Sequence, residues 1–141
     1  MKISTKGRYA LNVLIDVALH DNGNFISLKD ISQRQDITVK YLEQIVSALC
    51  KAGYLKSMRG NNGGYRLSME PSKCNIGEML RNVEGNLTPV ECVAGIEGIG
   101  CPKSEVCATL PFWKGLDKTV NDYINSYTLE DLISQKQKAS N

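Results

Sequence analysis

The sequence predicts a mainly α-helical fold: a winged helix-turn-helix with a small β-hairpin wing, followed by a long C-terminal dimerisation helix. Two observations predict the first part. Apolar residues recur at helical spacing on both sides of a tight turn at residues 36–37, and a segment rich in glycine and asparagine follows at residues 59–64. A third observation predicts the long helix, because an apolar stripe runs from Trp113 to Tyr127 in steps of three and four residues.

The first two helices have recognisable starts. Residues 4–20 form the first predicted helix, which Ser4 can cap. Ser27 begins the second helix, because Ser27 and Asp30 have the spacing of a capping box. Residues 25–26, just before it, fit a short strand.

The third helix and the hairpin after it complete the winged helix. Thr38 can cap this helix, and Gly53 ends it, since glycine is the residue type favoured just past a helix C-terminus. Its apolar positions are predicted to face inward: Val39, Leu42, Ile45, Val46 and Leu49. Residues 54–58 and 65–68 have strand character, and the segment 59–64 between them tolerates the positive φ of a tight hairpin.

The second half of the chain contains further helices around a segment without periodicity. Asn75 can cap a fourth helix that Gly85 ends, and residues 86–106 show no period. Pro111 suits the first turn of the long helix. This helix carries a seam for pairing with another helix: Trp113, Leu116, Val120, Tyr123 and Tyr127. Thr128 and Asp131 mark a last short helix.

Composition and charge limit the class of protein. The chain has 141 residues, 42% apolar and 23% charged, which is typical of one soluble globular domain. It has no apolar run near the roughly 20 residues of a membrane span, and its N-terminus lacks the apolar core of a signal peptide. We therefore expect a cytoplasmic protein without a membrane partner. Residues 1–73 carry a net charge of +5 and residues 74–141 one of −3, which favours a polyanion partner at the first half.

The exposed positions of the third helix predict DNA recognition. The second helix of a helix-turn-helix enters the major groove, and its N-terminal residues meet the base edges. The candidates there are Thr38, Lys40, Tyr41, Glu43 and Gln44. A glutamine can form a bidentate contact with adenine, and a glutamate can accept from the amino group of cytosine.

Two other segments provide candidate contacts with the DNA backbone and the minor groove. Arg59 stands at the tip of the slim hairpin, which suits a narrow minor groove with its deep negative potential. The first helix offers possible phosphate contacts: Lys2, Ser4, Lys6 and Tyr9. A polar helix face or a glycine hairpin alone is usually only solvated surface, so the prediction depends on their order along the chain.

Three cysteines form a candidate metal site. Cys92, Cys101 and Cys107 have the spacing C-x8-C-x5-C, and three thiolates on one loop can hold an iron–sulfur cluster or a zinc ion. Three free thiols are the alternative that the spacing leaves open. Cys50 is expected to be a small core residue and Cys74 to be exposed. With one histidine and no adjacent nucleophile, no hydrolytic triad can form, so we expect no enzyme.

Five features of the sequence resemble one known family. They are KGRYAL at 6–11, DIS at 30–32, YLEQ at 41–44, RG..GGY at 59–65 and the loop cysteines. They resemble the IscR-type winged-helix transcription regulators, a family of iron–sulfur cluster regulators that includes related cysteine-metabolism repressors, and the similarity extends from Met1 to about Ile133.

The resemblance implies a homodimeric bacterial repressor or activator with a [2Fe–2S] cluster held by three cysteines and a histidine. It further implies that Glu43 decides the class of promoter and that Arg59 enters the minor groove. The sequence departs from the family pattern at Leu110, which stands in the place of the histidine, and the first cysteine gap is longer. Several candidates remain for the fourth ligand: Cys74, Glu91, Glu97, Glu105, a residue of the other subunit, or an exogenous molecule.

Together these features predict a dimeric, sequence-specific DNA-binding transcription regulator of a palindrome-like operator, with affinity set by an iron–sulfur cluster. Its domains would be a DNA-binding unit at 1–73, dimerisation helices at 74–134 with a cluster loop at 90–107, and a disordered tail at 135–141. The first alternative is a metal-free regulator of cysteine or sulfur metabolism, controlled by a partner protein or by thiol redox state. A zinc-stabilised interaction module that does not act on DNA is the second.

Overall fold

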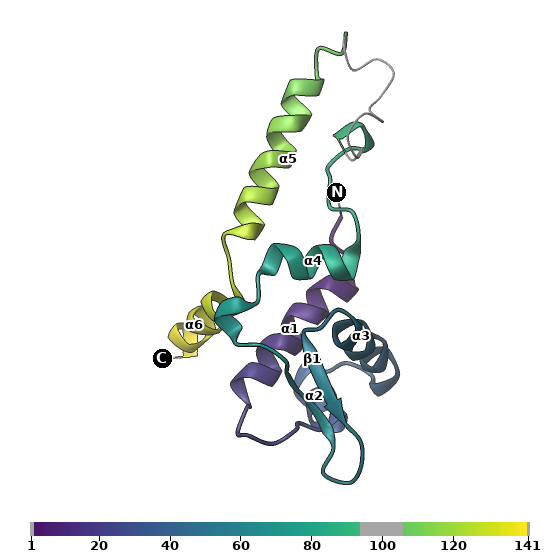
Figure 1. The fold of residues 1–141 in the computed structure, drawn as a ribbon, viewed down its shortest axis with the longest axis vertical. Helices are drawn as coiled ribbons and strands as arrows, with labels where there is room; N and C mark the ends of the chain where they lie inside the picture. Colours follow the sequence, from purple (N-terminus) through teal and green to yellow (C-terminus); the bar gives the residue numbers. More distant parts are fainter. Residues whose placement is uncertain (1, 94–105, 141) are drawn as a thin grey trace.

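The computed structural model describes residues 2–93 and 106–140 (Figure 1). Within those ranges it is mostly helical, with one antiparallel hairpin and two short 3-10 helices. In chain order the elements are α1 (Thr5–Leu19), α2 (Leu28–Gln35), α3 (Val39–Lys51), β1 (Leu55–Met58), β2 (Gly64–Leu67), η1 (Pro71–Lys73), α4 (Ile76–Glu84), η2 (Glu91–Val93), α5 (Leu110–Asn125) and α6 (Leu129–Ser140). No helix in these ranges is long and apolar enough to cross a membrane. The mainly α-helical winged fold is thereby confirmed.

The starts of three helices follow from local capping, as predicted. The Ser27 side chain accepts a hydrogen bond from the Asp30 N–H at the start of α2, at 3.1 Å. The Thr38 hydroxyl accepts from the Tyr41 N–H at the start of α3, and the Asn75 side chain caps α4 in the same way. These bonds satisfy N–H groups that a helix N-terminus otherwise leaves without partners.

The wing is a regular hairpin joined to the rest of the fold by one bridge. Strands β1 and β2 pair antiparallel from Leu55 opposite Leu67 to Met58 opposite Gly64. Ile26 exchanges two backbone hydrogen bonds with Tyr65 of β2, at 2.8 and 2.9 Å, so the expected short strand is present as a single antiparallel bridge beside the hairpin. A side chain at Gly64 would overlap the Ile26 carbonyl group, and its φ of +152° suits only glycine.

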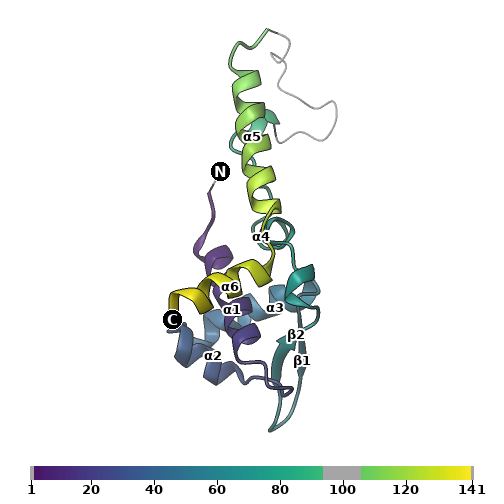
Figure 2. The ribbon, with the colours of Figure 1, turned by 90° about the vertical axis from the view of Figure 1, so that its left-hand side faces the viewer.

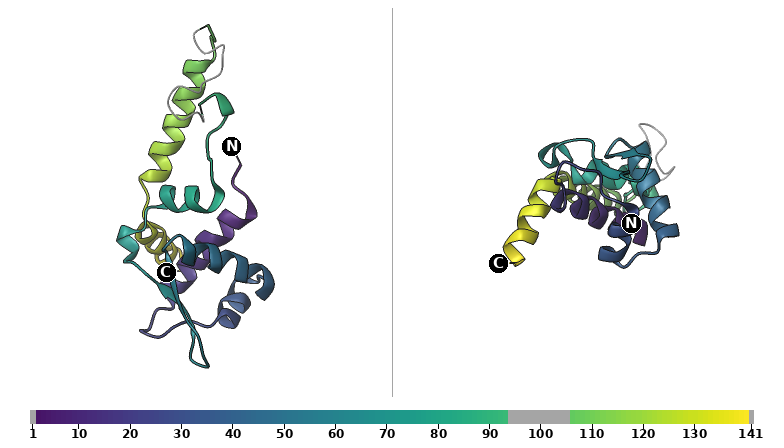
Figure 3. Two further views of the ribbon diagram at one scale, coloured as in Figure 1. Left: turned by 45° about the vertical axis from the view of Figure 1, so that its right-hand side comes forward. Right: turned by 90° about the horizontal axis from the view of Figure 1, so that it is seen from below.

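One hydrophobic core joins elements from both halves of the chain. Helix α1 lies at its centre and packs against α2, α3, α4, α6 and β2. The buried cluster includes Leu14 of α1, Leu42 of α3, Met79 of α4 and Leu129 of α6. Seen from below, α6 lies on one side of α1 and α3 on the other (Figure 3). Residue 73 therefore does not separate two cores.

Helix α5 extends from this core as an arm, away from the wing (Figures 1 and 2). Pro111 lies in the first turn of α5, as predicted. Two hydrogen bonds join it to α4, because the Arg81 guanidinium donates to the side-chain oxygens of Asn121 at 3.0 Å and Asn125 at 2.6 Å. These bonds fix the C-terminal half of α5 to the end of α4.

The C-terminal helix is longer than the sequence indicated. Thr128 and Asp131 start it as expected, with the Asp131 carboxylate accepting from the Thr128 N–H at 2.8 Å. However, α6 continues to Ser140, through most of the segment 135–141 for which disorder was predicted. Burial of Leu129 fixes its start against the core, and the lysines, glutamines and alanine that follow are good helix formers.

Candidate nucleic-acid interface

Helix α3 presents the predicted recognition residues to solvent. Its inner side is buried through Leu42, Ile45, Val46 and Leu49, which are at most 1% exposed. The candidate side chains outside this stripe are exposed: Thr38, Lys40, Glu43 and Gln44. A row of hydrogen-bonding groups on the first two turns of a helix has the chemistry that major-groove recognition requires.

Val39 departs from the prediction for this helix. The apolar spacing placed it on the inner side, yet it is 43% exposed. Val39 is the first residue of α3, and the buried stripe of this helix begins one turn later, at Leu42. Periodicity therefore assigned the right face to every other predicted apolar position of the helix but not to its first residue.

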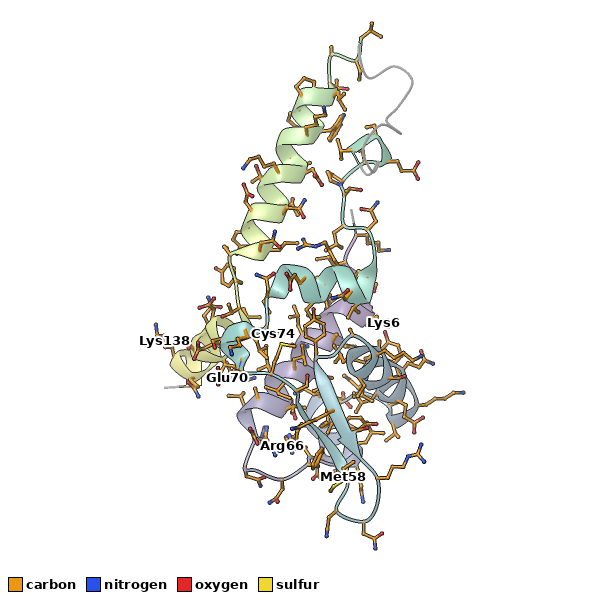
Figure 4. All side chains as sticks on the ribbon, viewed as in Figure 1. Lys6, Met58, Arg66, Glu70, Cys74 and Lys138 are labelled. Atoms are coloured by element: carbon orange, nitrogen blue, oxygen red, sulfur yellow. The ribbon has the colours of Figure 1, made fainter. Side chains whose placement is uncertain are left out.

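The N-terminus of α1 lies beside the start of α3. The ring of Tyr9 meets the ring of Tyr41 edge to face, with 5.8 Å between centroids. This contact brings two of the predicted DNA-binding residues together. Lys2 is exposed and Lys6 half-buried on the same segment; Figure 4 shows Lys6 next to α4. The structure therefore gathers the candidate phosphate-binding and base-reading segments on one part of the molecule.

Glu84 caps helix α1 from the end of α4. Its Oε1 accepts hydrogen bonds from the Ser4 N–H at 3.0 Å, the Ser4 hydroxyl at 2.6 Å and the Gly7 N–H at 2.8 Å. The Ser4 side chain itself caps no N–H of α1, which corrects the sequence prediction. A side chain at Gly7 would overlap the Glu84 carboxylate and would displace it from these hydrogen bonds. A carboxylate at this position is also favoured by the helix dipole.

Arg59 lies in the exposed turn of the wing, as predicted. Residues 58–62 are all exposed, and Gly63 closes the turn by donating to the Gly60 carbonyl at 3.0 Å. Gly60 has a φ of +112°, which explains a glycine at this place. The hairpin turn thus lies at the opposite end of the molecule from the arm (Figure 1).

An ion pair with the buried carboxylate of Asp16 fixes α2, the first helix of the motif, to α1. The Asp16 side chain is 1% exposed and accepts from Arg34 at 2.8 and 3.0 Å and from the Gln35 amide at 2.9 Å. Burial raises the pKa of Asp16, but the hydrogen bonds from Arg34 and Gln35 and the charge of Arg34 outweigh it, so its pKa is lowered overall. Asp16 therefore stays ionised and holds α2, and the turn before α3, in place.

Of the three candidate metal ligands, Cys92 and Cys107 are described and Cys101 lies outside the described residues. Cys92 belongs to η2, which packs against α5, and Cys107 lies just before the start of α5. A hydrogen bond with the Thr109 hydroxyl, at 3.3 Å, lowers the pKa of the Cys107 thiol and so favours the thiolate that binds metals. Within residues 2–93 and 106–140 no group of three metal-binding side chains gathers at one point.

Cys74 is buried and not exposed as the sequence suggested. It is 1% exposed where η1 meets α4 and α6 (Figure 4), and its carbonyl accepts from the Leu129 N–H at 2.9 Å. Burial and the nearby charge of Glu78 raise the pKa of its thiol to about 11. Because a thiol must lose its proton to bind a metal, Cys74 is a poor candidate for the fourth ligand. Leu110, in the place of the expected histidine, is 8% exposed and offers only carbon.

Sequence reasoning missed three residues that shape this interface: Glu84, Asp16 and the exposed Val39. Gly7 inside a helical pattern was a signal, since an isolated glycine often marks a close approach. The sequence could not identify Glu84 as the partner of Gly7 or Arg34 as the partner of Asp16, because these pairs lie 77 and 18 residues apart in the chain.

Comparison with known proteins identifies the family. A model of the Rrf2 family, described as an iron-dependent transcriptional regulator, matches residues 3–135. The chain is 39% identical to protein rrf2 of Nitratidesulfovibrio vulgaris, over 94% of this chain and 87% of that protein. It is 38% identical to the HTH-type transcriptional regulator IscR of Vibrio parahaemolyticus, over 97% of this chain and 80% of that one.

Solved structures agree with the sequence comparisons. The structure of CymR, the global cysteine regulator of B. subtilis, has a TM-score of 0.76 and 40% identity, over 96% of this chain and 98% of that one. The structure of T. potens IscR has a TM-score of 0.77 and 33% identity, over 99% and 90%. The relatives named as IscR and CymR are regulators and not enzymes. With a winged helix whose α3 exposes polar side chains, and with a family match over residues 3–135, this chain belongs to the Rrf2 family of transcriptional regulators.

Proposed function

We propose that this regulator binds a palindrome-like DNA site as a homodimer, with α3 in the major groove and Arg59 of the wing in the minor groove. The observation that carries the proposal is the exposed row Lys40, Glu43 and Gln44 on a capped helix, beside an exposed arginine on a slim hairpin. The first half of the chain supplies the positive charge that attracts a polyanion.

The arm supports the dimer. Of the sixteen residues of α5 only Leu110 is buried, while Phe112 and Tyr123 are 65% and 63% exposed. Together with the half-buried Leu116 and Val120 they form an apolar stripe that residues 2–93 and 106–140 leave uncovered. A second α5 packed on this stripe would cover it and place two recognition helices about one turn of DNA, ~34 Å, apart.

Selection from a random duplex library, followed by titration of the selected duplex at two salt concentrations, tests the DNA contact. Gln44→Ala is expected to relax the preference at one position of each half-site. Lys40→Ala should weaken binding severalfold, whereas Lys138→Ala, the same loss of charge on an exposed residue of α6, should not. Equal binding to every duplex at moderate salt, or an obligate monomer in sedimentation, would contradict the proposal.

We further propose that an iron–sulfur cluster of the [2Fe–2S] type on Cys92, Cys101 and Cys107 sets the DNA affinity. The donor set fits a soft metal centre, because all three ligands are thiols and one of the described pair has a lowered pKa. Iron is preferred to zinc because the family description is iron-dependent. A carboxylate, the partner subunit or an exogenous molecule would complete the ligands, since Leu110 cannot and Cys74 is buried.

Anaerobic reconstitution tests the cluster. The metal-to-protein and sulfide-to-protein ratios, the visible spectrum and operator binding are measured on the same sample. We expect bound iron and a changed DNA affinity, both lost in the variant with Cys92, Cys101 and Cys107 all changed to Ser and both kept in Cys50→Ser. A colourless product without iron that still binds its operator would refute cluster control.

The alternative is a metal-free regulator of cysteine or sulfur metabolism, controlled by a partner protein or thiol redox state. The 40% identity to CymR, named as a cysteine regulator, and the leucine at position 110 favour it. It predicts operator binding that is identical before and after the three loop cysteines are changed to Ala.

A further inference from the structure

We propose that Val39 is a specificity-determining residue whose methyl groups contact the 5-methyl group of a thymine in the major groove. The inference rests on the proposed DNA contact of α3. It begins with an exposed side chain: Val39 is the one large hydrophobic residue of α3 that is largely exposed, at 43%, on a helix that the structure describes in full.

Val39 belongs neither to the hydrophobic core nor to the partly buried residues that pack against it. The Thr38 cap starts the helix, and the buried residues Ile37 and Leu42 flank it at the positions of a hydrophobic staple. Valine is also a poorer helix former than most residues. Neither helix initiation nor the core therefore explains a branched apolar side chain at this position.

The position of Val39 on the helix points to the DNA side. Residues four apart lie on the same side of a helix, so Val39 borders Glu43, and both adjoin the outward row of Lys40 and Gln44. Val39 is also the first residue of α3, and the N-terminal part of a recognition helix approaches the base edges most closely.

The chemistry of the groove identifies the ligand. Lys40, Glu43 and Gln44 all recognise hydrogen-bonding groups of bases. The thymine methyl is the one base feature of the major groove that offers no hydrogen bond and is read by apolar contact. An exposed valine among polar side chains is complementary to that group alone.

Replacement of single thymines by deoxyuridine in the selected duplex tests this inference, because it removes only the 5-methyl group. We expect one thymine in each half-site at which the change weakens binding by wild-type protein about fourfold, the value of one buried methyl. Val39→Ala removes the contact in both half-sites of the dimer, so it should weaken binding to the unmodified duplex about sixteenfold, fourfold for each half-site, and should lose the sensitivity to deoxyuridine.

Two further variants control for folding and for general effects of apolar residues. Val39→Thr keeps the branched shape and should reduce the advantage of thymine. Met58→Ala, at a wing residue of similar exposure, 44%, should keep the full deoxyuridine effect. The inference is overturned if no thymine is sensitive, or if Val39→Ala and Val39→Thr respond as wild type does. Failure to select any preferred duplex would instead overturn the DNA contact itself.

Discussion

The winged helix-turn-helix (α1 to α3 with the hairpin β1–β2), the reading unit, and helix α5, the arm, differ in how many of their residues are buried. Six of the fifteen residues of α1 are buried, against one of the sixteen residues of α5. Among the described residues, the three most exposed large hydrophobic residues lie on the arm or just before it, at Val106, Phe112 and Tyr123. The reading unit is therefore buried against the core that it shares with α4 and α6, whereas most of the arm is not covered by the described residues. In the proposed homodimer, the arm would set the spacing of two DNA-binding surfaces.

Two leucine truncations measure this difference most directly. Leu42→Ala, at a residue with no exposed surface, should lower the free energy of unfolding by about 3 kcal/mol. Leu116→Ala on the arm should lower it by less than about 1 kcal/mol in dilute protein, because Leu116 is only half-buried. Urea unfolding monitored by circular dichroism gives both values. Similar losses would show that the arm is as complete as the reading unit.

Arg34→Ala tests the ion pair between α1 and α2. We expect a loss of about 2 kcal/mol, since the buried Asp16 carboxylate would keep only the Gln35 amide as a hydrogen-bond partner, with His20 at 3.8 Å. Arg66→Ala is the matched control, because its pair with Asp21 is partly solvated and should contribute less than about 0.5 kcal/mol. An equal effect of the two changes would contradict a special role for the buried pair.

Part of the Arg34 contribution should depend on pH. The folded pKa of Asp16 is lowered below its ordinary value of about 3.9, so its stabilisation is fully present above that value. It is lost as the pH falls through the folded pKa. Urea unfolding from pH 6 to pH 3 should therefore show a steeper loss for wild type than for Asp16→Asn, which cannot titrate. Parallel curves would rule this contribution out.

Loss of the Glu84 cap should change the free energy of unfolding by less than loss of Arg34, and it should reverse the sign of the effect of Gly7→Ala. Glu84→Ala should lower the free energy of unfolding by about 1 kcal/mol, whereas Glu70→Ala, at an exposed carboxylate without a capping bond, should not. Gly7→Ala should destabilise wild type because the new methyl overlaps Glu84. In the Glu84→Ala background the same change should stabilise, because alanine favours a helix. Additive effects of the two changes would contradict the contact.

The reactivity of two thiols, one in the core and one at the base of the arm, should differ between the two regions. Cys74, buried in the core with a pKa of about 11, should react with iodoacetamide only on global unfolding. Cys107 at the base of the arm is partly exposed and should react in the native state. Mass spectrometry of digests at rising urea concentration follows both. Early labelling of Cys74 would indicate that α4 and α6 separate before the rest unfolds.

Elements whose causes are local could be predicted from the amino-acid sequence. Ser27, Thr38 and Asn75 accept from N–H groups three residues away, and the wing needs glycine within its own turn, so spacing along the chain contains these interactions. The exposed polar row of α3 was predictable for the same reason, because helical periodicity separates it from the buried stripe.

Tertiary structure alone decided the contacts between distant segments. Glu84 reaches the start of α1 and Arg34 reaches Asp16 only because α4 and α2 pack on α1, and no spacing rule names such partners. Burial of Cys74 and exposure of Val39 likewise depend on where the neighbouring elements end. Periodicity tells which residues share a face of a helix, but the packed neighbours decide how far along that face water is excluded.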